Sequence, residues 1–337
     1  MKLRSSLRAL ACIAAACGAG LAAEAAPSYH LVDLGAGTAA SGINNHGAVS
    51  GASGGVAAVW HDGAWHLRPQ GTGAADIDDD GELVGTATIG PDGKPRQAYW
   101  PKDAPPVEIV TPYGAKQTHA IAVGAGQVAG YGSAADGAYH CFAWTLAGGA
   151  VDLASAASQG WCTATDINDA GQVTGNTTPA GGAYANAFIW QGGVMSFLGT
   201  LPGGHTSYGL AINRKGHVAV RSQRLMPTGE IHEHAALWNG SRLVDLGSVY
   251  TGGSSYPSAM NDHDDVVGSA SNHHGFVSTA FLYTDGQMFD LLPLIDDTAG
   301  WHLYDPLGIA DDGTIVGTGS VDNVSHGYML VPLTALH

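Results

Sequence analysis

Hydrophobic and turn-forming residues follow one another in a short pattern that is clearest at residues 166–175, Asp-Ile-Asn-Asp-Ala-Gly-Gln-Val-Thr-Gly. Ile167 and Val173 are β-branched, which suits strands. Between them, Asn168 and Asp169 can hydrogen bond to their own backbone, and Gly171 can adopt the positive φ that tight turns require. The stretch therefore predicts a β-hairpin.

The hairpin pattern occurs seven times along the chain. The copies are residues 43–51, 77–85, 122–130, 167–175, 212–220, 260–268 and 309–317, of which 122–130 is degenerate. The intervals between their first residues are 34, 45, 45, 45, 48 and 49 residues. A period of about 40 to 50 residues is typical of the four-stranded blades of a β-propeller.

Two further strand-like runs follow each hairpin. The first combines small and aromatic residues, often ending in Trp, at residues 57–60, 98–100, 142–144, 187–190, 235–238, 280–283 and 327–330. The second is short and often contains Asp-Leu, as at residues 151–153, 195–198, 243–246 and 288–291. Together with the two arms of the hairpin, these runs give four strands per repeat.

The last repeat has no Asp-Leu strand of its own, whereas residues 29–35 form one ahead of the first hairpin. We therefore predict an all-β fold: a seven-bladed β-propeller of four-stranded antiparallel blades, closed by the N-terminal strand joining the last blade. Closure of this kind removes exposed sheet edges. The pattern leaves two alternatives open, an open β-solenoid and a pair of β-sandwiches.

Residues 1–25 have the features of a secretory signal peptide. Lys2, Arg4 and Arg8 precede an Ala-rich apolar run, and residues 23–25 (Ala-Glu-Ala) form a small-x-small cleavage site. Lipid modification of Cys17 is an alternative, but Ala14 stands where a large aliphatic residue is expected. We expect residues 26–337 to form a single propeller domain. No later apolar run reaches the roughly 20 residues of a membrane helix, so we expect a soluble monomer that is secreted, periplasmic or at the cell surface.

The net charge of −16 limits the partners of the protein. Loss of residues 1–25 removes three basic side chains and one acidic one, which leaves −18. Such a surface repels nucleic acid, and it also disfavours acidic polysaccharides. The predicted partner is an extracellular glycan or protein, and no nucleic acid.

Two cysteines, Cys141 and Cys162, remain outside the predicted signal. Export to an oxidising compartment permits a disulfide between them, which would join neighbouring blades. Two separate buried thiols are the alternative.

The repeat, Ile-Asn-x-x-Gly-x-Val-x-Gly followed by His/Asn-small-Phe-x-Trp and Asp-Leu-Gly, resembles the HAF repeat of bacterial extracellular proteins. The match is best at residues 167–199, and residues 140–142, 234–236 and 326–328 resemble the His-Ala-Phe triplet that gives the family its name. Residues 97 and 279 and the first repeat depart from it. The resemblance implies an exported, propeller-type repeat protein. It implies no established activity and no catalytic residues.

In a propeller, the hairpin turns lie together on one face, here called the hairpin face. This face is expected to be acidic, and Asp76, Asp78 and Asp80 match the opening of a calcium-binding loop. The closing carboxylate of such a loop is missing, because Glu82 comes too early. An acidic hairpin turn is therefore the favoured interpretation, and these three residues remain weak metal candidates.

The opposite face, here called the top face, carries the longer loops, which are rich in aromatic residues. Aromatic rings among polar loops suit sugar binding, because C–H faces pack on π systems, although each ring could equally fill a gap between blades. The candidate ligand-binding residues are Tyr113, Trp161, Tyr208, Tyr256, Trp301, Tyr304, His119, His205 and His302, and Tyr250 lies in the same class of loop.

The remaining histidines allow two interpretations. His140, His234 and His326 occupy a repeated position, which favours a structural role. His232 and His234 alternate along one strand and could chelate a metal with Glu230, although the sequence identifies no third close ligand.

We expect an exported, non-enzymatic protein that binds a glycan or an extracellular protein through the aromatic top-face loops. The sequence identifies no catalytic residues and no cofactor. The alternative is a polysaccharide lyase or hydrolase at the mouth of the pore, with Arg221 or Arg224 neutralising an acidic sugar.

Overall fold

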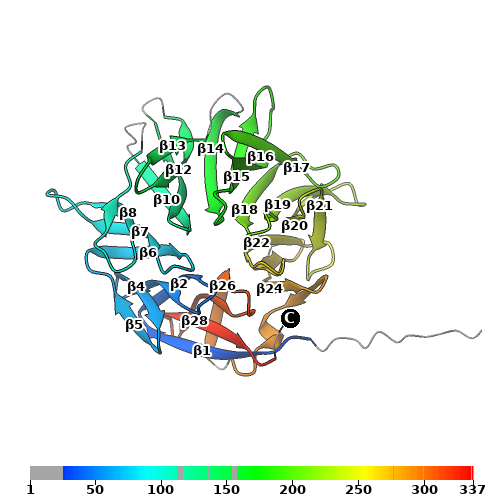
Figure 1. Cartoon of the computed structure of the whole chain (residues 1–337). Helices are drawn as coiled ribbons and strands as arrows, with labels where there is room; N and C mark the ends of the chain where they lie inside the picture. The colour runs from blue at the N-terminus through cyan, green and yellow to red at the C-terminus, as the bar shows by residue number, and fades with distance from the viewer. Residues whose placement is uncertain are drawn as a thin grey trace, which may run out of the picture.

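Seven four-stranded antiparallel sheets surround one central axis in the computed structural model of the chain (Figure 1). The structure describes residues 26–337 except 112–116, 135–136, 154–157, 276, 299, 335 and 337, and it does not describe the side chains of 117, 158–160 and 305. The predicted signal peptide, residues 1–25, lies outside the described residues. The predicted fold class is confirmed.

Six blades are continuous in sequence, and their strands run in chain order from the axis outward. Blade 1 consists of β2 (Thr38–Ile43), β3 (Val49–Ser53), β4 (Val56–His61) and β5 (Ala64–Leu67). Blade 2 consists of β6 (Gly71–Ile77), β7 (Leu83–Thr88), β8 (Pro95–Trp100) and β9 (Val107–Glu108). Blade 3 consists of β10 (Gln117–Gly124), β11 (Gln127–Ser133), β12 (Tyr139–Thr145) and β13 (Gly149–Asp152).

The same order holds in the next three blades. Blade 4 consists of β14 (Ser158–Ile167), β15 (Val173–Pro179), β16 (Asn186–Gln191) and β17 (Val194–Gly199). Blade 5 consists of β18 (Ser207–Ile212), β19 (Val218–Leu225), β20 (Ile231–Trp238) and β21 (Leu243–Gly247). Blade 6 consists of β22 (Ser254–Met260), β23 (Val266–Ser271), β24 (Ser278–Thr284) and β25 (Gln287–Asp290), after which a 3-10 turn, η1 (Leu292–Leu294), leads to blade 7.

Blade 7 joins the two ends of the described chain. It contains β26 (Trp301–Ile309), β27 (Ile315–Val321) and β28 (Val324–Pro332), and its outermost strand is β1 (Tyr29–Ala36). Tyr29 pairs with Pro332 and Asp33 with Tyr328, so β1 (blue) lies beside β28 (red) in Figure 1. This confirms the predicted closure by the N-terminal strand.

Each predicted hairpin turn is formed, and the Asn of the repeat explains its shape. In blade 4, Asn168 Oδ1 accepts hydrogen bonds from the backbone N–H groups of Ala170 and Gln172, at 3.1 and 3.0 Å. Gly171 follows with a φ of 71°, a conformation that residues with a Cβ rarely adopt. The local sequence therefore encodes the turn.

The hydrophobic core lies between neighbouring blades rather than in one central mass. A representative layer contains Ile167, Val173 and Phe188 of blade 4 packed with Ala129 and Leu153 of blade 3, all buried. The same boundary carries the disulfide between Cys141 of β12 and Cys162 of β14, with a Cα–Cα distance of 5.1 Å. The predicted disulfide is confirmed. Within the described part of the chain, no helix is long and apolar enough to span a membrane.

Candidate functional site

A belt of asparagines joins the blades around the axis on the hairpin face. The side-chain amide of Asn168 donates to the carbonyl of Asn213 at 2.8 Å, and that of Asn213 donates to the carbonyl of Asn261 at 3.1 Å. Asn44 bonds the carbonyl of Asp78, and Asn261 that of Ala310, in the same way. In blades 1, 4, 5 and 6, the Asn that shapes the turn therefore also ties it to the next blade.

In blades 1, 2, 5, 6 and 7, the following residue of the turn makes a second set of contacts between blades. Asp79 Oδ1 accepts from the N–H of Asn45, Asp262 Oδ1 from that of Arg214 and Asp311 Oδ1 from that of Asp262, at 2.8 to 2.9 Å. Asn45 Oδ1 accepts a hydrogen bond from the N–H of Asp311 at 2.9 Å. This bond joins blade 7 to blade 1. These residues rim the mouth of the pore.

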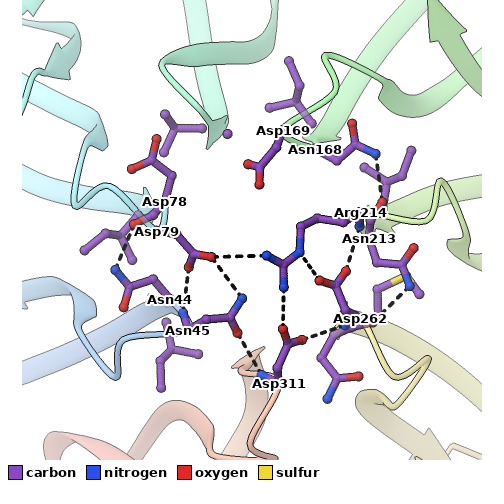
Figure 2. Close-up of a pocket in the computed structure, with 18 of the residues that line it drawn as sticks. Asn44, Asn45, Asp78, Asp79, Asn168, Asp169, Asn213, Arg214, Asp262 and Asp311 are labelled. Carbon is purple, nitrogen blue, oxygen red and sulfur yellow. Dashed lines mark hydrogen bonds and ion pairs between the residues drawn. The ribbon is translucent and has the colours of Figure 1, made fainter.

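Arg214 lies at the centre of this mouth, where it points toward three aspartates (Figure 2). It forms ion pairs with Asp262, with Asp311 at 2.7 Å and with Asp79 at 3.9 Å. The hydrogen bond to Asp262 and the charges of Asp262 and Asp311 raise the pKa of Arg214. Three carboxylates from blades 2, 6 and 7 thus share one cation, and all four residues line a cavity of about 150 Å³.

Deeper along the axis, a second cavity of about 250 Å³ is lined by Asp76 and Asp166. Asp76 Oδ2 accepts from the N–H of Val123 at 2.9 Å, and Asp166 Oδ2 from that of Ile212 at 2.7 Å. Both side chains are half-buried, and they lie deep inside the ring. Burial raises the pKa of Asp76 to about 6, and burial together with the charge of Asp76 raises that of Asp166 to about 8.

The three residues that resemble a calcium loop take up separate positions. Asp76 lies in the channel, as described above, and Asp78 shapes its turn by accepting from the N–H of Glu82 at 2.8 Å. Asp78 also accepts from the N–H of Gly126 in blade 3, and Asp80 is exposed on the turn. Their oxygens serve the turn and the blade boundary. Among the described residues, Asp76, Asp78 and Asp80 do not belong to any group of metal-ligand atoms that lie close together.

On the top face, four rings form a continuous row across blade 3 onto blade 4, here called the aromatic row: His119, Tyr131, Tyr139 and Trp161. Successive ring centroids lie 4.9, 5.7 and 4.3 Å apart. Tyr139 and Trp161 are stacked with an interplanar angle of 25°. Trp161 is 62% exposed, and the other three rings are half-buried. His119 and Trp161 were predicted from the sequence, whereas Tyr131 and Tyr139 were not.

The other predicted top-face residues do not join this row. Tyr208 lies under the guanidinium of Arg221, 4.3 Å from the ring centroid, and Trp301 packs edge-on against Tyr328. Tyr304 is exposed and donates to Ser320 Oγ. The remaining predicted residues are His205, exposed and stacked on Tyr184; His302, exposed; Tyr250 and Tyr256, both half-buried; and Tyr113, which lies outside the described residues.

The arginines of the enzymatic alternative already have partners. Arg221 stacks on Tyr208 and lies 3.5 Å from Glu233, and Arg224 pairs with Asp245. An acidic sugar would have to displace these contacts.

The repeated histidines clamp the third strand of a blade to its fourth. His234 Nδ1 hydrogen bonds to Asp245 Oδ1 at 2.8 Å, and His326 Nδ1 to Asp33 Oδ1 at 2.8 Å. The equivalent pair in blade 3 is His140 and Asp152, at 3.1 Å. Arg96 with Glu108 and Thr279 with Asp290 make the corresponding contact in blades 2 and 6. These pairs, here called the strand clasps, place the repeated histidines in a structural role.

Comparison with known proteins supports the fold alone. No protein-family profile matches the chain, and no curated protein matches its sequence. The β-propeller domain of the Trilobed protease from Pyrococcus furiosus is similar in structure, with a TM-score of 0.54, 10% identity and coverage of 92% of this chain and 99% of that one. A putative TolB from Agrobacterium tumefaciens gives 0.43 at 11% identity, over 79% of this chain and 88% of that one.

Proposed function

We propose that the protein is an exported, non-enzymatic propeller that binds a neutral glycan through the aromatic row. The observation that supports this most is the stacked pair of Tyr139 and Trp161, which presents a largely exposed indole at the end of a row of rings. Large exposed aromatic side chains are costly to leave in water, and their π faces suit the C–H faces of sugars.

Polar groups and charge narrow the class of glycan. Ser133 lies opposite Tyr139 in the pairing of β11 with β12, so a hydroxyl group flanks the rings. A net charge of −16 disfavours uronic acid or sulfated chains at long range. A neutral oligosaccharide lying along the rings therefore fits better than an acidic one.

A glycan array tests the proposal on the purified protein. Wild type is expected to bind one group of neutral oligosaccharides, and Trp161→Ala and Tyr139→Ala are expected to weaken that binding roughly 10-fold or more. Tyr304→Ala is the matched control, because Tyr304 is also exposed on the top face but lies outside the row. A wild type that binds no neutral glycan, or a Trp161→Ala variant that binds as well as Tyr304→Ala, would contradict the proposal.

Export is a separate part of the proposal. The disulfide between Cys141 and Cys162 is compatible with an oxidising compartment. Expression of the full chain in a bacterial host, fractionation and N-terminal mass spectrometry should find a mature protein that begins at residue 26. A cytoplasmic protein that retains residues 1–25 would contradict export.

A further inference from the structure

A group of metal-ligand side chains lies at the top face, where blades 5 and 6 meet. Glu230 immediately precedes β20, His232 lies at the start of that strand, and His273 comes from the turn between β23 and β24. Their ligand atoms all lie within 4.8 Å of one another. Sequence reasoning missed His273, because only the packing of blade 6 beside blade 5 brings this turn against β20.

The separations are close to those of a bound metal. Glu230 Oε2 lies 3.6 Å from His232 Nε2, and Glu230 Oε1 lies 3.8 Å from His273 Nε2. Metal–ligand bonds of about 2.1 Å in a tetrahedral site place neighbouring ligand atoms roughly 3.4 Å apart. The ligand atoms of His232 and His273 lie within 4.8 Å of one another, so bringing all three ligands onto one ion requires rotation of the exposed Glu230 and His273 side chains.

His232 gives independent support. Its side chain is only 10% exposed, and its buried Nδ1 has no hydrogen-bond partner. Its Nε2 faces Glu230 at a distance beyond that of a hydrogen bond. Nε2 is therefore placed to coordinate a metal that Glu230 also binds, whereas the buried Nδ1 takes no part in the site.

Hydrogen bonds fix the backbone of the two turns that carry Glu230 and His273. The turn before β20 is closed by a hydrogen bond from the Met226 N–H to the Glu230 carbonyl at 2.8 Å, and Thr228 Oγ1 lies 3.3 Å from the Glu230 carboxylate. The turn that carries His273 is closed by a 2.8 Å bond from the Gly275 N–H to the Asn272 carbonyl. The imidazoles of His232 and His273 are stacked, with centroids 5.2 Å apart.

We propose that Glu230, His232 and His273 bind one zinc ion, with a fourth position open to water or to a ligand. Two imidazoles and one carboxylate suit Zn²⁺, whereas Ca²⁺ and Mg²⁺ prefer oxygen ligands. His234, which alternates with His232 along the strand, is not a ligand, because it forms the strand clasp with Asp245. The ion would link blades 5 and 6 on the same face as the aromatic row.

Isothermal titration with ZnCl₂ tests this site on tag-free, chelator-treated protein at pH 7.5. Wild type is expected to bind one equivalent, and His273→Ala is expected to lose affinity roughly 100-fold or more. His273 lies in an exposed turn, so this variant should fold, and circular dichroism would check it. His302→Ala is the matched control, because His302 is exposed on the top face away from the cluster.

X-ray absorption at the zinc edge gives a second readout, in which wild type should show two imidazole ligands per ion. His232→Ala should remove one of them. The proposal would be overturned by a wild type that binds no zinc, or by a His273→Ala variant that keeps the affinity of the His302→Ala control. Because the aromatic row is separate, glycan binding can fail while zinc binding stands, and the reverse.

Discussion

At the scale of single residues, Asp76 and Asp166 in the channel differ from the surface aspartates because the surrounding blades partly shield them from water. Asp166 is stabilised by N–H donors from Ile167 and Ile212, yet burial and the charge of Asp76 raise its pKa to about 8. The folded protein therefore holds a proton on Asp166 that the unfolded chain, with a pKa near 3.8, releases. This lowers the free energy of unfolding as the pH rises from about 4 to about 8.

The first prediction concerns this dependence on pH. Asp166→Asn should lose less stability than wild type between pH 5 and pH 8, because it has no carboxyl group to ionise, and one proton accounts for at most about 1.4 kcal/mol per pH unit. Urea denaturation at several pH values measures the difference. Asp80→Asn, on an exposed turn, is the control and should follow wild type. Parallel curves for Asp166→Asn and wild type would contradict the assignment.

Arg214 gives a second prediction at this scale. Its side chain is half exposed, so the three ion pairs are partly screened, and Arg214→Met should destabilise the protein by about 1 kcal/mol at low salt. Urea denaturation of wild type and variant measures this difference in the free energy of unfolding. The difference should be smaller in 1 M NaCl, because salt screens exposed charges. A cost that is independent of salt would point to lost packing instead.

At the scale of elements, local chemistry made the strands and turns predictable, but register decides which side chains meet. The Ile-Asn-x-x-Gly turn and the aromatic strand follow from residues close in sequence. The strand clasp does not, because it depends on the pairing of β20 with β21, in which Asp245 lies opposite Ala236 and within hydrogen-bond distance of His234. Tyr131 and Tyr139 were missed for the same reason: they lie on strands, and the pairing of β11 with β12 brings them together.

The clasps give a third prediction. His234 is 5% exposed and His140 is 29% exposed, although both bond an Asp of the fourth strand. His234→Ala should therefore cost roughly 2 kcal/mol, because it removes a nearly buried partner of half-buried Asp245, whereas His140→Ala should cost about 0.5 kcal/mol. Denaturant unfolding at pH 7 measures both. Equal costs would show that burial does not set the strength of a clasp.

At the scale of the whole molecule, the period of the repeat was enough to predict the ring, its blade number and its closing strand. The contacts between blades were less predictable, since they depend on how the ring closes. His273 meets Glu230 only because blade 6 packs beside blade 5, and Arg214 reaches Asp79 only because blades 2 and 5 face one axis. The sequence alone shows the acidic turns, but it does not show that three of them share Arg214.

Closure itself gives the last prediction. β1 covers the edge of β28 and buries Tyr29 completely, and the N–H of Asp296 in the link after blade 6 donates to the Tyr29 carbonyl at 2.9 Å. Tyr29→Ala should cost about 3 to 5 kcal/mol, as for other large buried aromatic residues, and should lower the cooperativity of unfolding because the ring can open at this blade. Calorimetry and limited proteolysis measure the two effects, with exposed Tyr184→Ala as the control.

Because β1 and β28 are joined through the rest of the ring, opening there would release the N-terminal strand first. A Tyr29→Ala variant with the melting temperature of Tyr184→Ala, or one that proteases cut elsewhere before β1, would show that this strand does not fasten the propeller.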